Sequence, residues 1–183
     1  MHFRKRSTPR RSGVACTVVA MSMTIGGLAS TAACSAGTIE SDGPLRDFDK
    51  AAEGPFDDAR AEARIITSGD GSTVEFGLRR VDPAVAGHEF GAHLHLGPCV
   101  TDDDAAALGH YNSDVVAGRT PPRIDQTTEV WLDFVVDLDG RGEAVAQVPF
   151  VPEPGDRSIV VHEHGTVSDG TAGPRLACLP MEW

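Results

Sequence analysis

The amino-acid sequence predicts an all-β domain, either a sandwich or a barrel, and two observations support this fold class. Short runs rich in apolar and β-branched residues recur along the chain, and turn residues separate them. The sequence shows no long helical periodicity and no internal repeat. We expect seven strands, at residues 61–67, 73–78, 88–96, 129–138, 143–150, 158–163 and 175–179.

The first three strands are set by turn signals and by alternation. The sequence Ser68-Gly69-Asp70-Gly71 separates the first two strands, and the second one alternates apolar and polar residues. The third, 88–96, is an alternating apolar run, and a long segment rich in Gly, Pro and Asp follows it at 97–128. Loops of this length are usually functional or disordered. This one contains Cys99 and His110, so we interpret it as functional.

The remaining four strands are expected after that loop. The apolar run from Val130 to Val136 indicates a strand within 129–138, and Asp139-Gly140-Arg141-Gly142 turns the chain into 143–150. A break at 152–155 precedes 158–163, and 175–179 is the last strand.

The N-terminal 33 residues have the three-part layout of a secretory signal. Basic residues come first, a short apolar stretch follows at 13–29, and small residues precede Cys34. The apolar stretch is too short and too interrupted to favour a membrane-spanning anchor. We therefore expect a signal peptide at 1–33, a flexible tether at 34–58 and one β domain at 59–183.

The charge of the chain excludes one class of partner. The signal segment carries five of the 16 basic residues and none of the 27 acidic ones, so the exported part is strongly acidic. Such a surface argues against nucleic acid and against anionic membranes as partners.

The cysteines indicate an exported protein. Cys16 lies in the signal, and Cys34 stands where the acylated cysteine of a lipoprotein would stand. Lipidation of Cys34 would avoid an odd thiol, whereas Thr31 occupies a position where bacterial lipoproteins usually have Leu, so plain secretion remains the alternative. A lipid on Cys34 would anchor the protein to a membrane, which is the one membrane contact we expect. Cys99 and Cys178 remain in the domain, in a compartment where disulfides persist.

Two histidines of the third strand predict a metal site. His93 and His95 are two residues apart, so their side chains project from the same face of a strand. One further histidine from the long loop, His110, and one from a distant strand, His162, would complete a set of four nitrogens that suits Cu(II).

Two blocks of sequence resemble the site of a Cu/Zn superoxide dismutase. The first is Gly91-Ala92-His93-Leu94-His95, followed by Cys99 and by Gly109-His110-Tyr111-Asn112. The second is Ile159-Val160-Val161-His162-Glu163, followed by Gly173-Pro174-Arg175-Leu176-Ala177-Cys178. The resemblance covers roughly residues 60–180 and keeps the order and local spacing of both blocks.

This resemblance implies a fold, a site and an activity. The fold would be an eight-stranded Greek-key β-barrel, with copper held outside it under two loops by His93, His95, His110 and His162. Cys99 and Cys178 match the family disulfide, and Arg175 matches the arginine that attracts superoxide. The activity would be the copper-catalysed conversion of superoxide to oxygen and hydrogen peroxide, with His110 and Arg175 as catalytic residues.

The match fails at the zinc site and at one loop. Between Ser113 and Gly140 the chain has carboxylates but no histidine, so we expect no zinc. The segment between His162 and Arg175 has only twelve residues, which is short for the family. Both departures resemble copper-only members, in which a carboxylate takes the place of zinc beside the bridging histidine. We expect Glu129 in that role, with Asp125 as the alternative.

Two histidines lie outside the matching blocks, and two other functions are alternatives to the enzyme. His164 could be an auxiliary ligand, but a solvent-facing loop position is the better interpretation, and His88 is expected at the start of a strand. A module that binds or buffers copper without turnover is the main rival to the enzyme, since one fold can serve both functions. A sandwich without metal, serving in adhesion, is a third possibility.

Overall fold

The computed structural model describes residues 37–183, which form two antiparallel sheets. The four-stranded sheet consists, in spatial order, of β1 (Thr38–Pro44), β3 (Arg60–Ser68), β4 (Gly71–Arg79) and β7 (Gly142–Val148). The five-stranded sheet consists, in spatial order, of β2 (Arg46–Asp47), β9 (Arg175–Glu182), β8 (Asp156–His162), β5 (Glu89–His95) and β6 (Phe134–Val135). Short helices lie between strands: η1 (Pro83–Val85), η2 (Asp104–Ala107) and α1 (Ser113–Val116).

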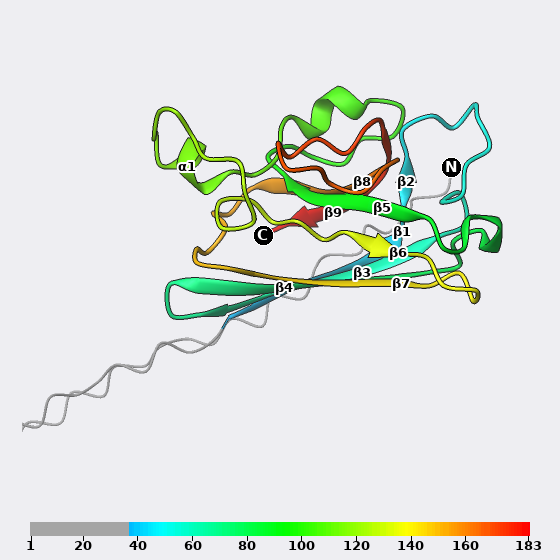
Figure 1. Ribbon diagram of the computed structural model, residues 1–183, viewed down its shortest axis with the longest axis horizontal. Coiled ribbons are helices and arrows are strands. Elements are labelled where there is room, and N and C mark those ends of the chain that lie inside the picture. Colours follow the sequence, from blue (N-terminus) through cyan, green and yellow to red (C-terminus); the bar gives the residue numbers. More distant parts are fainter. Residues whose placement is uncertain (1–36) are drawn as a thin grey trace, which may run out of the picture. The chain divides into compact units, whose positions relative to one another are not determined.

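The connections cross between the sheets, as in a Greek key. The chain passes from β4 to β5 and β6 in the other sheet, then returns to place β7 beside β4. In Figure 1 the two sheets form two layers, and the loops after β5 and after β8 lie on the outer face of the five-stranded sheet. The predicted all-β architecture is therefore confirmed.

The core fills the space between the sheets. The strands β3, β4, β5, β7, β8 and β9 contribute alternate residues to it, as the pleat requires. In β5 these are Phe90, Ala92 and Leu94, all at most 2% exposed. A second, smaller cluster lies on the other face of the five-stranded sheet, where Val160 packs against Cys99 and Cys178. The loop after β5 is thus fixed to the sheet by apolar contacts.

A disulfide joins that loop to the last strand. Cys99 and Cys178 are bonded, with a sequence separation of 79 and 5.6 Å between their Cα atoms. The pairing that the family resemblance implied is confirmed.

Two expectations about the strands were wrong. Residues 38–44 and 46–47 form β1 and β2, so part of the segment expected to be a tether lies in the sheets. β1 is an edge strand with polar residues on its solvent face, and this polar composition hid it from a search for apolar runs.

The second wrong expectation is the strand at 129–138, of which only β6 is regular. Glu129 and Trp131 make isolated bridges to Asn112 and His93. Glu129 also donates its amide to the Asp125 carbonyl, as in a helical turn, so regular pairing with β5 is interrupted.

The expected signal peptide at 1–33, with Cys16, and the proposed lipid site at Cys34 lie outside the described residues. Within residues 37–183, no helix has the length and apolar character needed to cross a membrane.

Candidate metal centre

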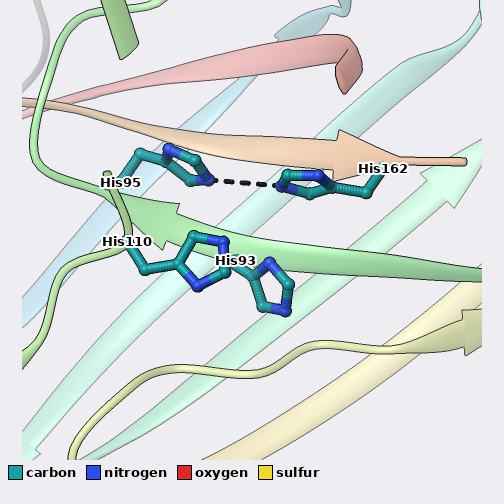
Figure 2. Close-up of side chains that lie close together, drawn as sticks. All are labelled: His93, His95, His110 and His162. Carbon is teal, nitrogen blue, oxygen red and sulfur yellow. Dashed lines mark hydrogen bonds between the residues drawn. The ribbon is translucent and has the colours of Figure 1, made fainter. Parts of the chain in front are cut away.

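Four histidine side chains converge on the outer face of the five-stranded sheet. One ring nitrogen from each of His93, His95, His110 and His162 lies within 4.8 Å of the others. Figure 2 shows the four rings grouped beside β5 and β8. They come from three segments that are far apart in sequence, and the structure brings together all four predicted ligands.

His93 and His95 owe their positions to the alternation of β5. Phe90, Ala92 and Leu94 face the core, so the two histidines project from the opposite face. That face is covered by loops, and both histidines are 0% exposed. Buried polar side chains need partners, so the burial of two imidazoles here calls for groups that satisfy both ring nitrogens.

His110 and His162 approach from the loop after β5 and from the end of β8. A single backbone bridge pairs His110 with His95, and His162 ends β8 where the pairing with β9 shifts by one residue. His162 is 4% exposed, whereas 19% of the His110 side chain is exposed. His110 is therefore the ring of the group that is nearest to solvent.

Three of the histidines use Nδ1 to hold their rings in place. His95 Nδ1 donates to the Leu108 carbonyl at 3.1 Å, and His162 Nδ1 donates to the Gly173 carbonyl at 3.1 Å. His110 Nδ1 donates to Glu129 Oε2 at 3.0 Å. In each neutral ring the proton is then on Nδ1, and Nε2 carries a lone pair.

Two ring nitrogens face each other at the centre of the histidine group. The dashed line in Figure 2 joins His95 Nε2 to His162 Nε2, which are 3.3 Å apart. Because both rings already donate from Nδ1, neither neutral ring has a proton to place between these two nitrogens. His93 Nδ1 is also buried and has no hydrogen-bond partner. Lone pairs that meet in this way fit a metal cation, and an all-imidazole set suits copper or zinc.

The environment keeps three of the rings neutral, as metal ligands must be. Burial lowers the pKa of His93 and of His95 far below the ordinary value of 6.5, and the other histidines add to the effect. Burial likewise lowers the pKa of His162, to about 4, although the bond to the Gly173 carbonyl opposes the shift. Protons therefore compete poorly with a metal at neutral pH.

Glu129 is the partner of His110, as the sequence predicted, and three donors surround it. Oε2 accepts from His110 Nδ1 and from Trp131 Nε1 at 2.9 Å, and Oε1 accepts from Asn112 Nδ2 at 3.0 Å. Burial raises the pKa of Glu129, but the three hydrogen bonds outweigh burial and leave it below the ordinary value. The carboxylate is thus a fixed anion behind the ring of His110.

The loop between β8 and β9 covers this carboxylate. Gly170 has φ +84°, and a Cβ there would lie 2.6 Å from Ile124 Cγ2 and 3.6 Å from Glu129 Oε2. A glycine is needed at this point for both reasons, the backbone conformation and the close approach.

Arg175 lies at the edge of the group and is tied to the loop after β5. Its guanidinium donates to the Asp104 carbonyl at 2.6 Å and to the Leu108 carbonyl at 2.5 Å. Its charge lowers the pKa of His95 and of His162, although less than burial does. The predicted arginine is therefore beside the histidines.

Three other predicted residues lie apart from the group. Asp125 binds the amide and hydroxyl of Thr127 and so stabilises a turn, which leaves Glu129 alone beside His110. His88 Nε2 lies 2.8 Å from the Glu163 carbonyl, and the His164 side chain is 62% exposed. Within residues 37–183, the group of candidate metal ligands consists of the four histidines alone.

Sequence reasoning missed the roles of Trp131 and Thr166. The indole Nε1 of Trp131 donates to Glu129 Oε2. Thr166 Oγ1 lies 2.7 Å from His93 Nε2. A lone threonine in a loop gives no signal in one sequence, so this contact could not have been predicted.

Comparison with known proteins identifies the fold. No protein-family model and no curated protein matches the chain. A double mutant of a SOD-like protein from Bacillus subtilis matches with a TM-score of 0.52 and 18% identity, over 78% of this chain and 97% of that one. The clock protein EA4 matches with a TM-score of 0.52 and 17% identity, over 87% of this chain and 99% of that one. The chain therefore has the fold of superoxide dismutase-like proteins, a two-sheet β-sandwich that carries a buried group of four histidines.

Proposed function

We propose that the protein is a copper-dependent superoxide dismutase that works without zinc. One observation carries the proposal: one ring nitrogen from each of four histidines lies within 4.8 Å of the others, and a carboxylate binds the Nδ1 of His110. The SOD-like fold and the disulfide agree with this assignment.

The proposed copper ligands are His93, His95, His110 and His162. Their nitrogens suit copper in both of its oxidation states, and the bonds on the outer nitrogens fix the orientation of each ring. When bound, copper would supply the one-electron exchange with superoxide.

His110 is the ring of the group that is best placed to reach solvent. It is the most exposed of the four, and Glu129 lies behind it as a buried anion. A carboxylate in that position stabilises the positive charge that the ring acquires when both nitrogens are protonated. Glu129 thereby fixes the orientation of the His110 ring from its Nδ1 side, with a charge opposite in sign to that of the second cation in a zinc-bearing site.

Arg175 is proposed to draw the anion to the site. Its charge is permanent, and its fixed guanidinium lies beside His95 and His162. The strongly acidic composition of the chain opposes capture of an anion, so a local cation at the mouth has more to offset here than in a neutral protein.

We further propose that the protein works outside the cytoplasm, either secreted or held by a lipid on Cys34. The Cys99–Cys178 disulfide supports this location, because disulfides persist in oxidising compartments. The basic and apolar N-terminal segment supports export.

A copper-buffering protein on the same fold is the second candidate. The observation that favours it is the hydrogen bonding of Arg175, whose guanidinium donates to the carbonyls of Asp104 and Leu108. An arginine used in this way braces a loop, and the same four histidines could store copper without turnover.

One experiment distinguishes the two candidate functions. The protein is loaded with one copper, freed of zinc with a chelator, and assayed for superoxide dismutation beside His110→Ala and Arg175→Ala. The enzyme predicts a fast wild-type rate, a large loss in His110→Ala and a partial loss in Arg175→Ala. Tight copper binding with a rate no higher than that of buffer would leave the buffering function.

A further inference from the structure

Thr166 connects three segments of the site. It lies in the loop between β8 and β9, four residues after His162, yet its hydroxyl contacts His93 of β5, with 2.7 Å between Oγ1 and Nε2. Its backbone amide donates to Asp133 Oδ1 at 2.5 Å. The neighbouring His164 carbonyl accepts from the amide of Gly91 at 2.8 Å, which fixes the loop to β5. These backbone hydrogen bonds fix the position of Thr166, and with it the position of its hydroxyl.

The hydrogen bond between Thr166 Oγ1 and His93 Nε2 has two possible directions. If it donated its proton, Nε2 would be the acceptor and the ring proton would be on Nδ1. That proton would be buried among three other imidazoles, where Nδ1 has no hydrogen-bond partner. A buried N–H without an acceptor is among the rarest features of folded proteins.

The other arrangement leaves no buried ring N–H without an acceptor. Nε2–H donates to Thr166 Oγ1, and the lone pair is on Nδ1, which faces the rings of His110 and His162 at centroid distances of 4.0 and 5.0 Å. This is the opposite tautomer from that of His95, His110 and His162, whose protons are on Nδ1. His93 thus needs an acceptor on the other side of its ring, and Thr166 is the group in that place.

We propose that Thr166 is a positioning residue that selects the Nε2–H tautomer of His93 and so prepares Nδ1 to bind the metal. The identification of that metal as copper rests on the proposed function, but the tautomer does not. The short loop between β8 and β9 then contributes directly to ligand geometry, because Asp133 holds the Thr166 backbone and Thr166 holds His93.

The tautomer can be read directly in the metal-free protein. Long-range proton–nitrogen correlation spectra distinguish a protonated Nδ1 from a protonated Nε2 in each histidine. We expect His93 to have the proton on Nε2 and the other three ligands to have it on Nδ1. A wild-type His93 with its proton on Nδ1 would overturn the inference without any variant being made.

Two variants and a control test the role of the hydroxyl. Thr166→Val keeps the shape and removes the acceptor, so His93 should become a mixture of tautomers, and Thr166→Ser should restore the Nε2–H form. Thr171→Val is the matched control, because Thr171 lies in the same loop and its hydroxyl donates to Asp169 at 2.7 Å. An unchanged His93 signal in Thr166→Val would contradict the proposal.

Copper affinity gives a second readout. Loss of a hydrogen-bond partner behind a metal ligand typically weakens binding about 10- to 100-fold. We expect that loss in Thr166→Val and wild-type affinity in Thr166→Ser and Thr171→Val, and equal affinity in all four proteins would count against the inference. A protein that binds copper through the predicted tautomer but does not dismutate superoxide would refute the proposed function and leave the role of Thr166 standing.

Discussion

Arg175 and His95 donate to the same oxygen atom, the carbonyl of Leu108, at 2.5 and 3.1 Å. The cation at the mouth of the site and one of the four histidines are therefore fixed by a single backbone group. Leu108 itself has φ +60°, which is uncommon for a residue with a side chain. The loop after β5 therefore has an uncommon backbone conformation at Leu108, the residue whose carbonyl binds both side chains.

Replacing Arg175 should slow the capture of superoxide more than it weakens copper binding. In Arg175→Ala the Leu108 carbonyl still accepts from His95, so we expect copper affinity close to that of the wild type. The rate constant for superoxide should fall about tenfold or more, because charge at a binding site raises association rates by roughly 10 to 10³. Arg175→Lys should be intermediate, since it keeps the charge but loses the forked pair of bonds.

The control for Arg175 is another arginine, Arg64 on β3, which is 55% exposed and lies near Glu40 on the four-stranded sheet. Arg64→Ala removes the same charge from the other sheet. Equal rates in Arg64→Ala and Arg175→Ala would show that net charge alone governs capture.

Replacing Glu129 should weaken copper binding. Glu129→Gln keeps the volume but removes the anion behind His110 and leaves three surrounding donors with a weaker partner. We expect a loss of about 10- to 100-fold in copper affinity, measured by competition with a chelator of known strength. Glu143→Gln on the exposed side of β7 is the matched control. Identical copper affinities in the two variants would show that Glu129 does not support copper binding.

The metal-free protein should lose stability as the pH falls from 7 to 5. Burial holds the pKa of His93, His95 and His162 below 6.5 in the folded chain, whereas the unfolded chain binds protons near that value. In this interval the unfolded state binds more protons, so the free energy of unfolding decreases with falling pH. The slope is at most about 1.4 kcal/mol per pH unit for each histidine.

Urea unfolding at several pH values measures this slope, and bound copper should shift the loss of stability to lower pH. A free energy of unfolding that is flat between pH 7 and pH 5 would mean that the histidines are not held neutral by the fold.

Breaking the disulfide should cost much of the stability. Cys99 and Cys178 close a loop with a sequence separation of 79, and the loop-entropy model gives roughly 4 kcal/mol for a loop of this length. Urea unfolding with and without a reductant, and of the double variant Cys99→Ser with Cys178→Ser, measures the change. A difference below about 1 kcal/mol would indicate that the packing of Val160 and Ala107 around the bridge holds the loop without it.

Local pattern predicted part of this structure well. Alternation in β5 placed His93 and His95 on one face, because side chains alternate in any strand. His162 was expected to complete a set of four nitrogens, and the resemblance supported it and added Arg175, because no local rule relates β5 to strands more than sixty residues away. Glu129 was chosen among several carboxylates because a ligating imidazole needs an acceptor. β1 was missed because an edge strand with a polar face resembles a linker in one sequence.

The contacts that pattern could not predict are those made between loops. The place of Thr166 beside His93 depends on how the loop after β8 closes over β5, which is decided by bonds such as that from Gly91 to the His164 carbonyl. Closure of this kind is a property of the packed molecule, and the local sequence around Thr166 does not encode it.

We propose that four histidines and Glu129 make a working superoxide dismutase with copper and without zinc. The most direct test is the decay of superoxide, followed by its absorbance after a pulse, in the presence of protein that carries one copper and a chelator that removes free metal. We expect decay proportional to protein concentration, with a rate constant approaching the diffusional ceiling of about 10⁸–10⁹ M⁻¹s⁻¹. Decay no faster than in buffer with the chelator alone, or activity that appears only when zinc is added, would contradict the claim.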